Sequence, residues 1–220
     1  MNSEKVKHNK FLVIIIAAVA STGGLLFGFD TGVISGALPF LRDSWDLTTS
    51  QQEWITTSAL IGALLGALSS GRLTDIFGRK KIIIITSVIF AVGSILTGAA
   101  PSPGMLAAAR IILGVAIGVS SFTVPLYISE ISPYKIRGAL VSSFQLMITI
   151  GILVSYFSDL AFADESNPFS WRWMFYVGVF PAIILFVGMI FLPETPRFLF
   201  AVGKEKKARK VMKMVEYPEL

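Results

Sequence analysis

Cysteine is missing from the 220-residue sequence, and its single histidine is His8. A disulfide framework, a thiol nucleophile and a Cys/His zinc or haem site are therefore excluded. Charged residues are also scarce, at 15%, whereas 54% of the residues are hydrophobic and the mean hydropathy is +0.71. This composition is typical of a membrane protein and excludes an ordinary soluble enzyme.

Long apolar runs, bounded by charged residues and by glycine or proline, divide the chain into six segments. Each is close to or longer than the roughly 20 residues that a helix needs to cross the bilayer core. We predict spans at 11–41, 54–71, 82–100, 105–129, 138–163 and 173–192. The predicted fold is an all-α membrane protein with a stub at 1–10, a six-helix bundle at 11–192 and a tail at 193–220.

A cleavable signal peptide is the competing interpretation of the N-terminus. Basic residues from Lys5 to Lys10 precede an apolar stretch, as they do in such peptides. The stretch is too long, however, and it continues to Asp30 without a clear small-x-small cleavage site. We therefore expect an uncleaved first span.

Lysine and arginine are distributed unevenly between the connecting segments. With a cytoplasmic N-terminus, sixteen of them lie inside, whereas Arg42 and Arg172 lie outside. Cytoplasmic segments carry the excess of basic residues, so we expect both termini in the cytoplasm. We expect the plasma (inner) membrane as the location of the chain. The net charge of +5 is then explained by anionic lipid and requires no nucleic-acid partner.

Two charged residues deep in the predicted spans are Asp30 in the first and Arg110 in the fourth. Both lie about 28 Å along the helix from the inner end of their spans, so they can face each other. An isolated charge at this depth is costly, and each residue therefore needs a partner or a water-lined cavity. The spacing is compatible with an inert ion pair and with a proton-coupling pair, in which Asp30 takes up a proton beside a permanent cation.

The segment 71–81, between the second and third spans, reads Gly-Arg-Leu-Thr-Asp-Ile-Phe-Gly-Arg-Lys-Lys. Gly71 and Gly78 permit a tight turn and close helix approach, and we place Asp75 at the positive end of the third helix. The basic residues alone would also serve as a topology signal. The pattern G-x3-D-x2-G-R-K-K resembles the signature loop of the major facilitator superfamily.

Further motifs resemble one branch of that superfamily, the sugar porters. They are GGLLFGFDTGVISG at 23–36, PLYISEISP at 125–133 followed by IRG at 136–138, Trp171-Arg172, and PETPR at 193–197. The resemblance implies a fold of twelve spans in two six-helix bundles, with the sugar between them near the midplane. The sequence corresponds to the first bundle, so we expect the C-terminal bundle to be absent and a complementary six-helix half to be a partner.

The resemblance also implies roles for single residues. Asp30 stands where proton-coupled sugar porters keep an acidic residue, and Arg110 stands at its partner position. Gln145 matches a sugar ligand, and its amide suits a hydroxyl group. Phe27 and Ile152 would supply an aromatic surface and an apolar wall. A helix–helix hydrogen bond is the alternative for Gln145, and ordinary packing is the alternative for Phe27.

Charges at the predicted inner helix ends resemble the family's cytoplasmic gating network, which ties helix ends together in the outward-facing state. Its members here are Gly71, Asp75, Gly78, Arg79, Glu130, Arg137, Glu194 and Arg197. Such pairs bias a two-state equilibrium, although surface ion pairs of little energy are the alternative. The tail places Ala208, Val211, Met212 and Val215 at helical spacing, which predicts short amphipathic helices on the inner membrane surface.

The predicted function is transmembrane transport of a monosaccharide, a pentose or a hexose, by proton symport, as the N-terminal half of a sugar porter. A passive facilitator half and a non-transporting truncated fragment of a sugar porter are the alternatives. We expect no enzyme activity, cofactor or metal, because the spans lack cysteine and histidine and we count Asp30 as their single carboxylate.

Overall fold

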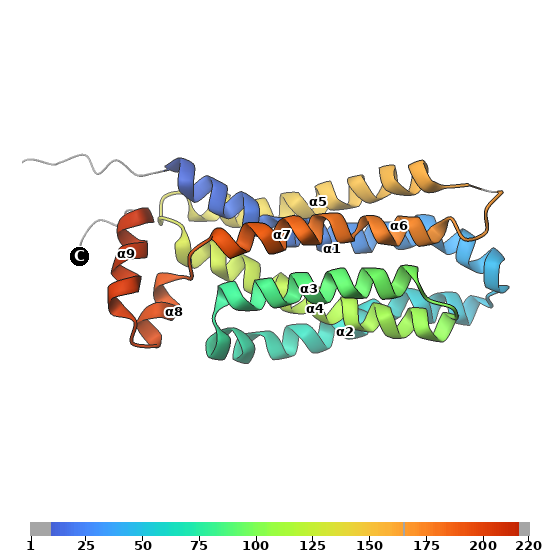
Figure 1. Ribbon diagram of the computed structural model, residues 1–220, viewed down its shortest axis with the longest axis horizontal. Helices are drawn as coiled ribbons and strands as arrows, with labels where there is room; N and C mark the ends of the chain where they lie inside the picture. Colours follow the sequence, from blue (N-terminus) through green and yellow to red (C-terminus); the bar gives the residue numbers. More distant parts are fainter. Residues whose placement is uncertain (1–9, 165, 216–220) are drawn as a thin grey trace, which may run out of the picture.

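The computed structural model describes residues 10–164 and 166–215. Six helical segments of this part are long and apolar enough to cross a membrane, as the sequence predicts. The elements are α1 (Lys10–Trp45), α2 (Thr49–Phe77), α3 (Arg79–Gly98), α4 (Pro103–Ile131), α5 (Arg137–Phe162), α6 (Trp171–Val177), α7 (Val179–Phe191), α8 (Pro196–Ala201) and α9 (Glu205–Val215), with α6 and α7 sharing one span. Figure 1 shows the long helices side by side, with α8 and α9 gathered at one end, hereafter the α9 end.

The segment 71–81, which the predicted spans 54–71 and 82–100 leave as a connection, is helical except at Gly78. Helix α2 continues past Gly71 to Phe77, and α3 begins at Arg79, so that Gly78 forms the whole connection. Gly78 has a φ of 93°, which L side chains rarely adopt. Hydropathy marks where apolar residues stop, but a helix continues for as long as its backbone hydrogen bonds do, which explains the difference.

Side-chain caps fix the first turns of three helices. Thr48 and Gln51 form a reciprocal capping box at the start of α2. Ser102 and Thr195 accept from the amide three residues later, and proline follows each of them at the first helical position. The caps thus satisfy backbone donors that have no partner within the helix.

Glycines let two helix pairs approach backbone to backbone. Helix α1 packs along α5, where a Cβ at Gly28 would overlap the carbonyl group of Ile148. Helix α2 packs along α4, where a Cβ at Gly118 would overlap the carbonyl group of Ala63. Small residues at such contacts are a common feature of membrane helix pairs.

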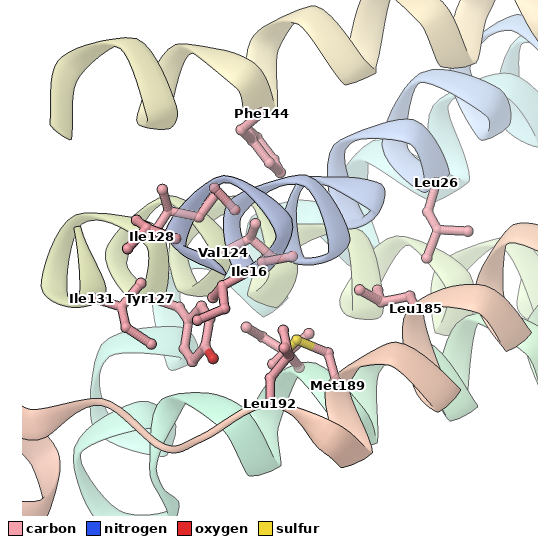
Figure 2. Packing of buried hydrophobic residues seen from close by; sticks show 14 of the residues in the cluster. Ile16, Leu26, Val124, Tyr127, Ile128, Ile131, Phe144, Leu185, Met189 and Leu192 are labelled. Atoms are coloured by element: carbon pink, nitrogen blue, oxygen red, sulfur yellow. The ribbon is translucent and has the colours of Figure 1, made fainter. Parts of the chain in front are cut away.

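The apolar core consists of two clusters, one above the other along the bundle. The cluster toward the α9 end joins α1, α3, α4, α5 and α7, and Figure 2 shows Phe144 of α5 and Met189 of α7 converging on it. The second cluster joins the far ends of α1 and α4 to α6, around the fully buried Trp171. On α1 the clusters meet between Leu26 and Phe29.

The tail forms the two short helices that its spacing predicts. Ala208, Val211 and Val215 of α9 are buried, whereas Met212 is partly exposed. The beginning of α1 and helix α9 lie at the same end of the bundle (Figure 1). Residues 1–9, which include His8, Lys5 and Lys7, lie outside the described residues, as do 216–220 of the predicted tail.

Candidate functional site: a buried ion pair and a charged helix-end network

Asp30 and Arg110 face each other in the interior of the bundle. The two guanidinium nitrogens Nη1 and Nη2 of Arg110 donate to Oδ1 and Oδ2 of Asp30, each at 3.3 Å. Only 2% of the Arg110 side chain and 5% of the Asp30 side chain are exposed. The two-point geometry fixes the orientation of both groups, so the pairing expected from their heights along the helices is found.

The surroundings of this pair are mostly apolar. It lies where the two core clusters meet, and the Phe175 ring of α6 is 5.9 Å from the Cζ atom of Arg110. The Nε atom of Arg110 is buried without a hydrogen-bond partner among the described residues. Removing either charge would therefore leave the other without compensation in a buried, mostly apolar environment.

The three predicted sugar-binding residues lie on α1 and α5 with different exposures. Gln145 is exposed, whereas Phe27 and Ile152 are partly buried. Gln145 and Ile152 are two turns apart on one face of α5. Phe27 also packs against the core cluster nearer the α9 end, so its ring has a structural contact whatever else it binds.

Polar side chains are exposed along the same two helices. Thr31 and Ser35 follow Phe27 at four-residue intervals on α1, and Thr149 follows Gln145 on α5. Thr31 Oγ1 and Thr149 Oγ1 donate to carbonyl groups of their own helices. Uncovered polar groups on membrane-length helices indicate a surface that faces water or protein rather than lipid.

A second polar region lies between α1 and the first turns of α2. Its cleft has a volume of about 300 Å³. The lining residues are Leu38, Thr49, Gln52, Glu53, Thr56 and Thr57. Hydroxyl, amide and carboxylate groups thus line an opening at the end opposite α9, which the sequence analysis did not identify.

Glu130 is the centre of the charged network at the α9 end. Arg79 contacts it through Nε at 3.1 Å and Nη2 at 3.2 Å, and Thr195 Oγ1 donates to it at 2.7 Å. Arg79 also contacts Asp75 at 3.1 Å, and the exposed Arg197 lies 3.7 Å from Glu130. The side chains of Arg79 and Glu130 are 8% and 4% exposed, so their contact is not a surface ion pair.

Glu194 joins the same region through main-chain donors. Its Oε1 atom accepts from the amides of Lys80 at 3.1 Å and Thr195 at 2.9 Å. Burial raises the pKa of Glu194 above its usual value, although these hydrogen bonds and Arg79 favour the ionised form. A Cβ at Gly78 would overlap this carboxylate, which gives that glycine a steric role as well as a turn.

Some predicted positions lie elsewhere. Gly71 is inside α2, and no residue of another described helix lies within 4 Å of the place that its Cβ would occupy, so the described helices do not approach closely there. Asp75 lies in the last turn of α2 rather than at the start of α3. Arg137 donates to the main-chain carbonyl group of Ser132, at 3.3 and 3.4 Å.

A second buried carboxylate within the spans was missed. Asp159 of α5 is 7% exposed, and neither carboxylate oxygen has a hydrogen-bond partner of ordinary geometry among the described residues. It lies against α1, where a Cβ at Gly36 would overlap the carboxyl group. The count of one carboxylate in the spans is therefore wrong, and the error was avoidable because the predicted span 138–163 already contained Asp159.

A family model described as "Sugar (and other) transporter" matches residues 16–219. The galactose-proton symporter of Escherichia coli K12 is 46% identical over 94% of this chain, which covers 44% of that relative. The arabinose-proton symporter of the same strain is 40% identical over 98% of the chain, which covers 45% of it. The chain therefore spans a little under half the length of these curated relatives.

Solved structures agree with this assignment. The proton:xylose symporter XylE bound to 6-bromo-6-deoxy-D-glucose is 31% identical and superposes with a TM-score of 0.88 over 95% of this chain and 50% of that one. The inward open conformation of XylE from E. coli gives a TM-score of 0.83 over 91% of this chain and 52% of that one. The chain thus belongs to the sugar transporter family within the major facilitator superfamily, as an integral, multi-pass membrane protein that matches about half of the solved family fold.

Proposed function

We propose that this chain is the N-terminal half of a proton-coupled monosaccharide symporter, with residues 11–192 as the membrane bundle. The observation that carries the proposal is the two-point contact between Asp30 and Arg110, closed off from solvent and adjacent in the chain to the exposed Thr31. A carboxylate whose charge is balanced by one permanent cation loses that balance when it takes up a proton. In this proposal, proton binding to Asp30 therefore weakens its contact with Arg110.

The sugar binds, in this proposal, on the polar face that α1 and α5 leave uncovered. Gln145 hydrogen-bonds a hydroxyl group, and Phe27 and Ile152 provide the apolar contacts. In the most apolar 18-residue stretch of α5 only 17% of the residues are buried, whereas 61% are buried in the corresponding stretch of α4. That difference, together with the exposed polar groups, supports a complementary six-helix half that covers this face and completes the site.

The network around Glu130 acts as the inner gate. Its contacts join the ends of α2, α3 and α4 to the segment before α8. We place the chain in the plasma (inner) membrane, with the α9 end and both termini on its cytoplasmic side, because the basic residues gather at that end of the bundle. Sugar binding and protonation of Asp30 together favour the state in which these contacts separate.

Sugar-dependent alkalinisation of the medium tests the proposal. De-energised cells express the chain alone, a complementary C-terminal half alone, or both, and receive galactose, arabinose or xylose. Alkalinisation and uptake by the pair alone are expected. Asp30→Asn in the pair should abolish alkalinisation and accumulation, whereas Asp43→Asn, at an exposed aspartate, should leave both unchanged.

Three outcomes contradict the proposal in different ways. Uptake by the pair without any alkalinisation would make the chain half of a passive facilitator. No uptake by the pair, with both halves inserted in the membrane, would make it a non-transporting fragment of a sugar porter. Accumulation of sugar by the Asp30→Asn pair would remove this residue from the coupling step.

A further inference from the structure

A cleft of about 430 Å³ opens at the α9 end, between the start of α3, the α7–α8 connection and α9. Lys80, Lys204, Lys207 and Lys210 line it, and Glu194 is the acidic residue in the lining. Four ammonium-bearing side chains thus surround one opening. Neither the ion pair inside the bundle nor the gate around Glu130 uses these lysines.

The carboxylate of Glu194 offsets at most one of the four positive charges in the lining. It accepts from the amides of Lys80 and Thr195 at 2.9–3.2 Å. Within the described ranges, Lys204, Lys207 and Lys210 form no ion pair. The cleft therefore carries an excess of positive charge, which attracts an anion.

The fold positions these lysines through the packing of α9. Lys204, directly before α9, and Lys207 and Lys210 within it recur at three-residue intervals and follow one side of the helix. Ala208 and Val211 are buried against the rest of the chain, which fixes the rotation of α9. The side of α9 that carries these lysines therefore faces the cleft.

Apolar surface adjoins the charged opening. Leu199, Val211 and Met214 contribute to the lining. At the end of α7, Ile190 and Phe191 are 46% and 81% exposed, and Lys80 Nζ donates to the Ile190 carbonyl oxygen at 2.7 Å. One lysine of the cleft is thus attached to the last lipid-facing turn of a membrane span, at the level where lipid headgroups lie.

We propose that this cleft binds the phosphate headgroup of an anionic membrane phospholipid. The phosphate sits between Lys80 and the lysines of α9, and the acyl chains run along Ile190 and Phe191. Basic pockets beside membrane helices suit such headgroups. A bound lipid would tie α9 to α3 and α7 by charge as well as by apolar packing.

Lipid binding by the full chain tests this site without any transport measurement. The chain is placed in phosphatidylcholine nanodiscs with or without phosphatidylglycerol, and native mass spectrometry counts the phosphatidylglycerol retained. Lys207→Gln/Lys210→Gln removes two lining lysines. Lys206→Gln/Lys213→Gln removes two charges from the same helix outside the lining and is the matched control. Circular dichroism and size exclusion establish that both variants fold.

Retention of phosphatidylglycerol should weaken about tenfold or more in the lining variant and much less in the control. Backbone hydrogen exchange in α9 should slow with phosphatidylglycerol in the parent chain, and not in the lining variant. Equal losses in the two variants would reduce the effect to general attraction by the membrane surface and overturn the site. Equal slowing by inorganic phosphate in phosphatidylcholine nanodiscs would assign the cleft to a soluble phosphate and overturn the lipid.

If the lining pair fails to fold, Lys204→Gln replaces it, because that residue precedes the first turn of α9. It should weaken retention roughly fivefold, and unchanged retention would overturn the proposal.

Discussion

The two buried aspartates of this chain have opposite surroundings. Asp30 accepts two hydrogen bonds from Arg110, whereas Asp159 lies against Gly36 without a cation or a hydrogen-bond partner of ordinary geometry in the described part of the chain. Both are less than a tenth exposed. A carboxylate within a span is therefore not in itself the sign of a charge pair, and its role depends on the group that faces it.

Of the substitutions that test this comparison, Asp30→Leu should change the free energy of unfolding most. It leaves the Arg110 guanidinium buried without its partner, so the free energy of unfolding should fall by about 3–5 kcal/mol. Asp30→Leu/Arg110→Leu removes both charges and should recover most of the loss. Reversible unfolding in mixed micelles measures the three variants. A double variant as unstable as the single one would mean that packing, and not the unpaired charge, sets the loss.

Gly28→Ala and Gly36→Ala compare the α1–α5 contact at two heights. A Cβ at Gly28 would overlap the backbone carbonyl group of Ile148, which cannot move alone, whereas at Gly36 it would overlap the side chain of Asp159 from its Cβ atom to its carboxyl group, which can rotate in part. We expect Gly28→Ala to lower the free energy of unfolding by about 3 kcal/mol and Gly36→Ala by about 1 kcal/mol. The same unfolding measurement applies, and equal losses would contradict the difference in rigidity.

Asp159→Leu should have an effect of opposite sign to Asp30→Leu. It replaces a buried carboxyl group that has no hydrogen-bond partner of ordinary geometry among the described residues by an apolar side chain of the same branched shape, so the free energy of unfolding should rise by about 1–2 kcal/mol. The midpoint of unfolding in mixed micelles reports the change. A clear loss of stability would show that Asp159 has a polar partner in the folded chain.

Glu194 is an intermediate case, since main-chain amides hold it. Burial raises its pKa above 4.5, so the folded chain binds this proton more tightly than the unfolded chain does. Stability from this group is present at low pH and is lost as pH rises from 4.5 through the raised pKa. Glu194→Gln should flatten this pH dependence, because the amide does not titrate. A titration of unfolding midpoints measures it, and an unchanged slope would assign the pH dependence to other groups.

The sequence predicted the structure correctly where the fixed geometry of a helix was sufficient. The rise of a helix per residue placed Asp30 and Arg110 at one height, and their contact is found. The sequence did not predict features that depend on which other helices lie nearby. The charged residues after Gly71 are polar but helical, and nothing in the residues around Asp159 indicates whether α1 presents a cation or a glycine there. The exposure of Gln145 likewise depends on which helices cover α5.

The sequence separation of the buried pair has a consequence for biosynthesis. Asp30 precedes Arg110 by 80 residues. At roughly 5–20 residues per second, the carboxylate is synthesised about 4–16 s before the guanidinium that balances it. During that interval the first helix carries an uncompensated acidic group, so it must stay beside the insertion channel, remain near water or hold a proton. When the fourth helix enters the membrane, Asp30 is already in the chain to pair with Arg110.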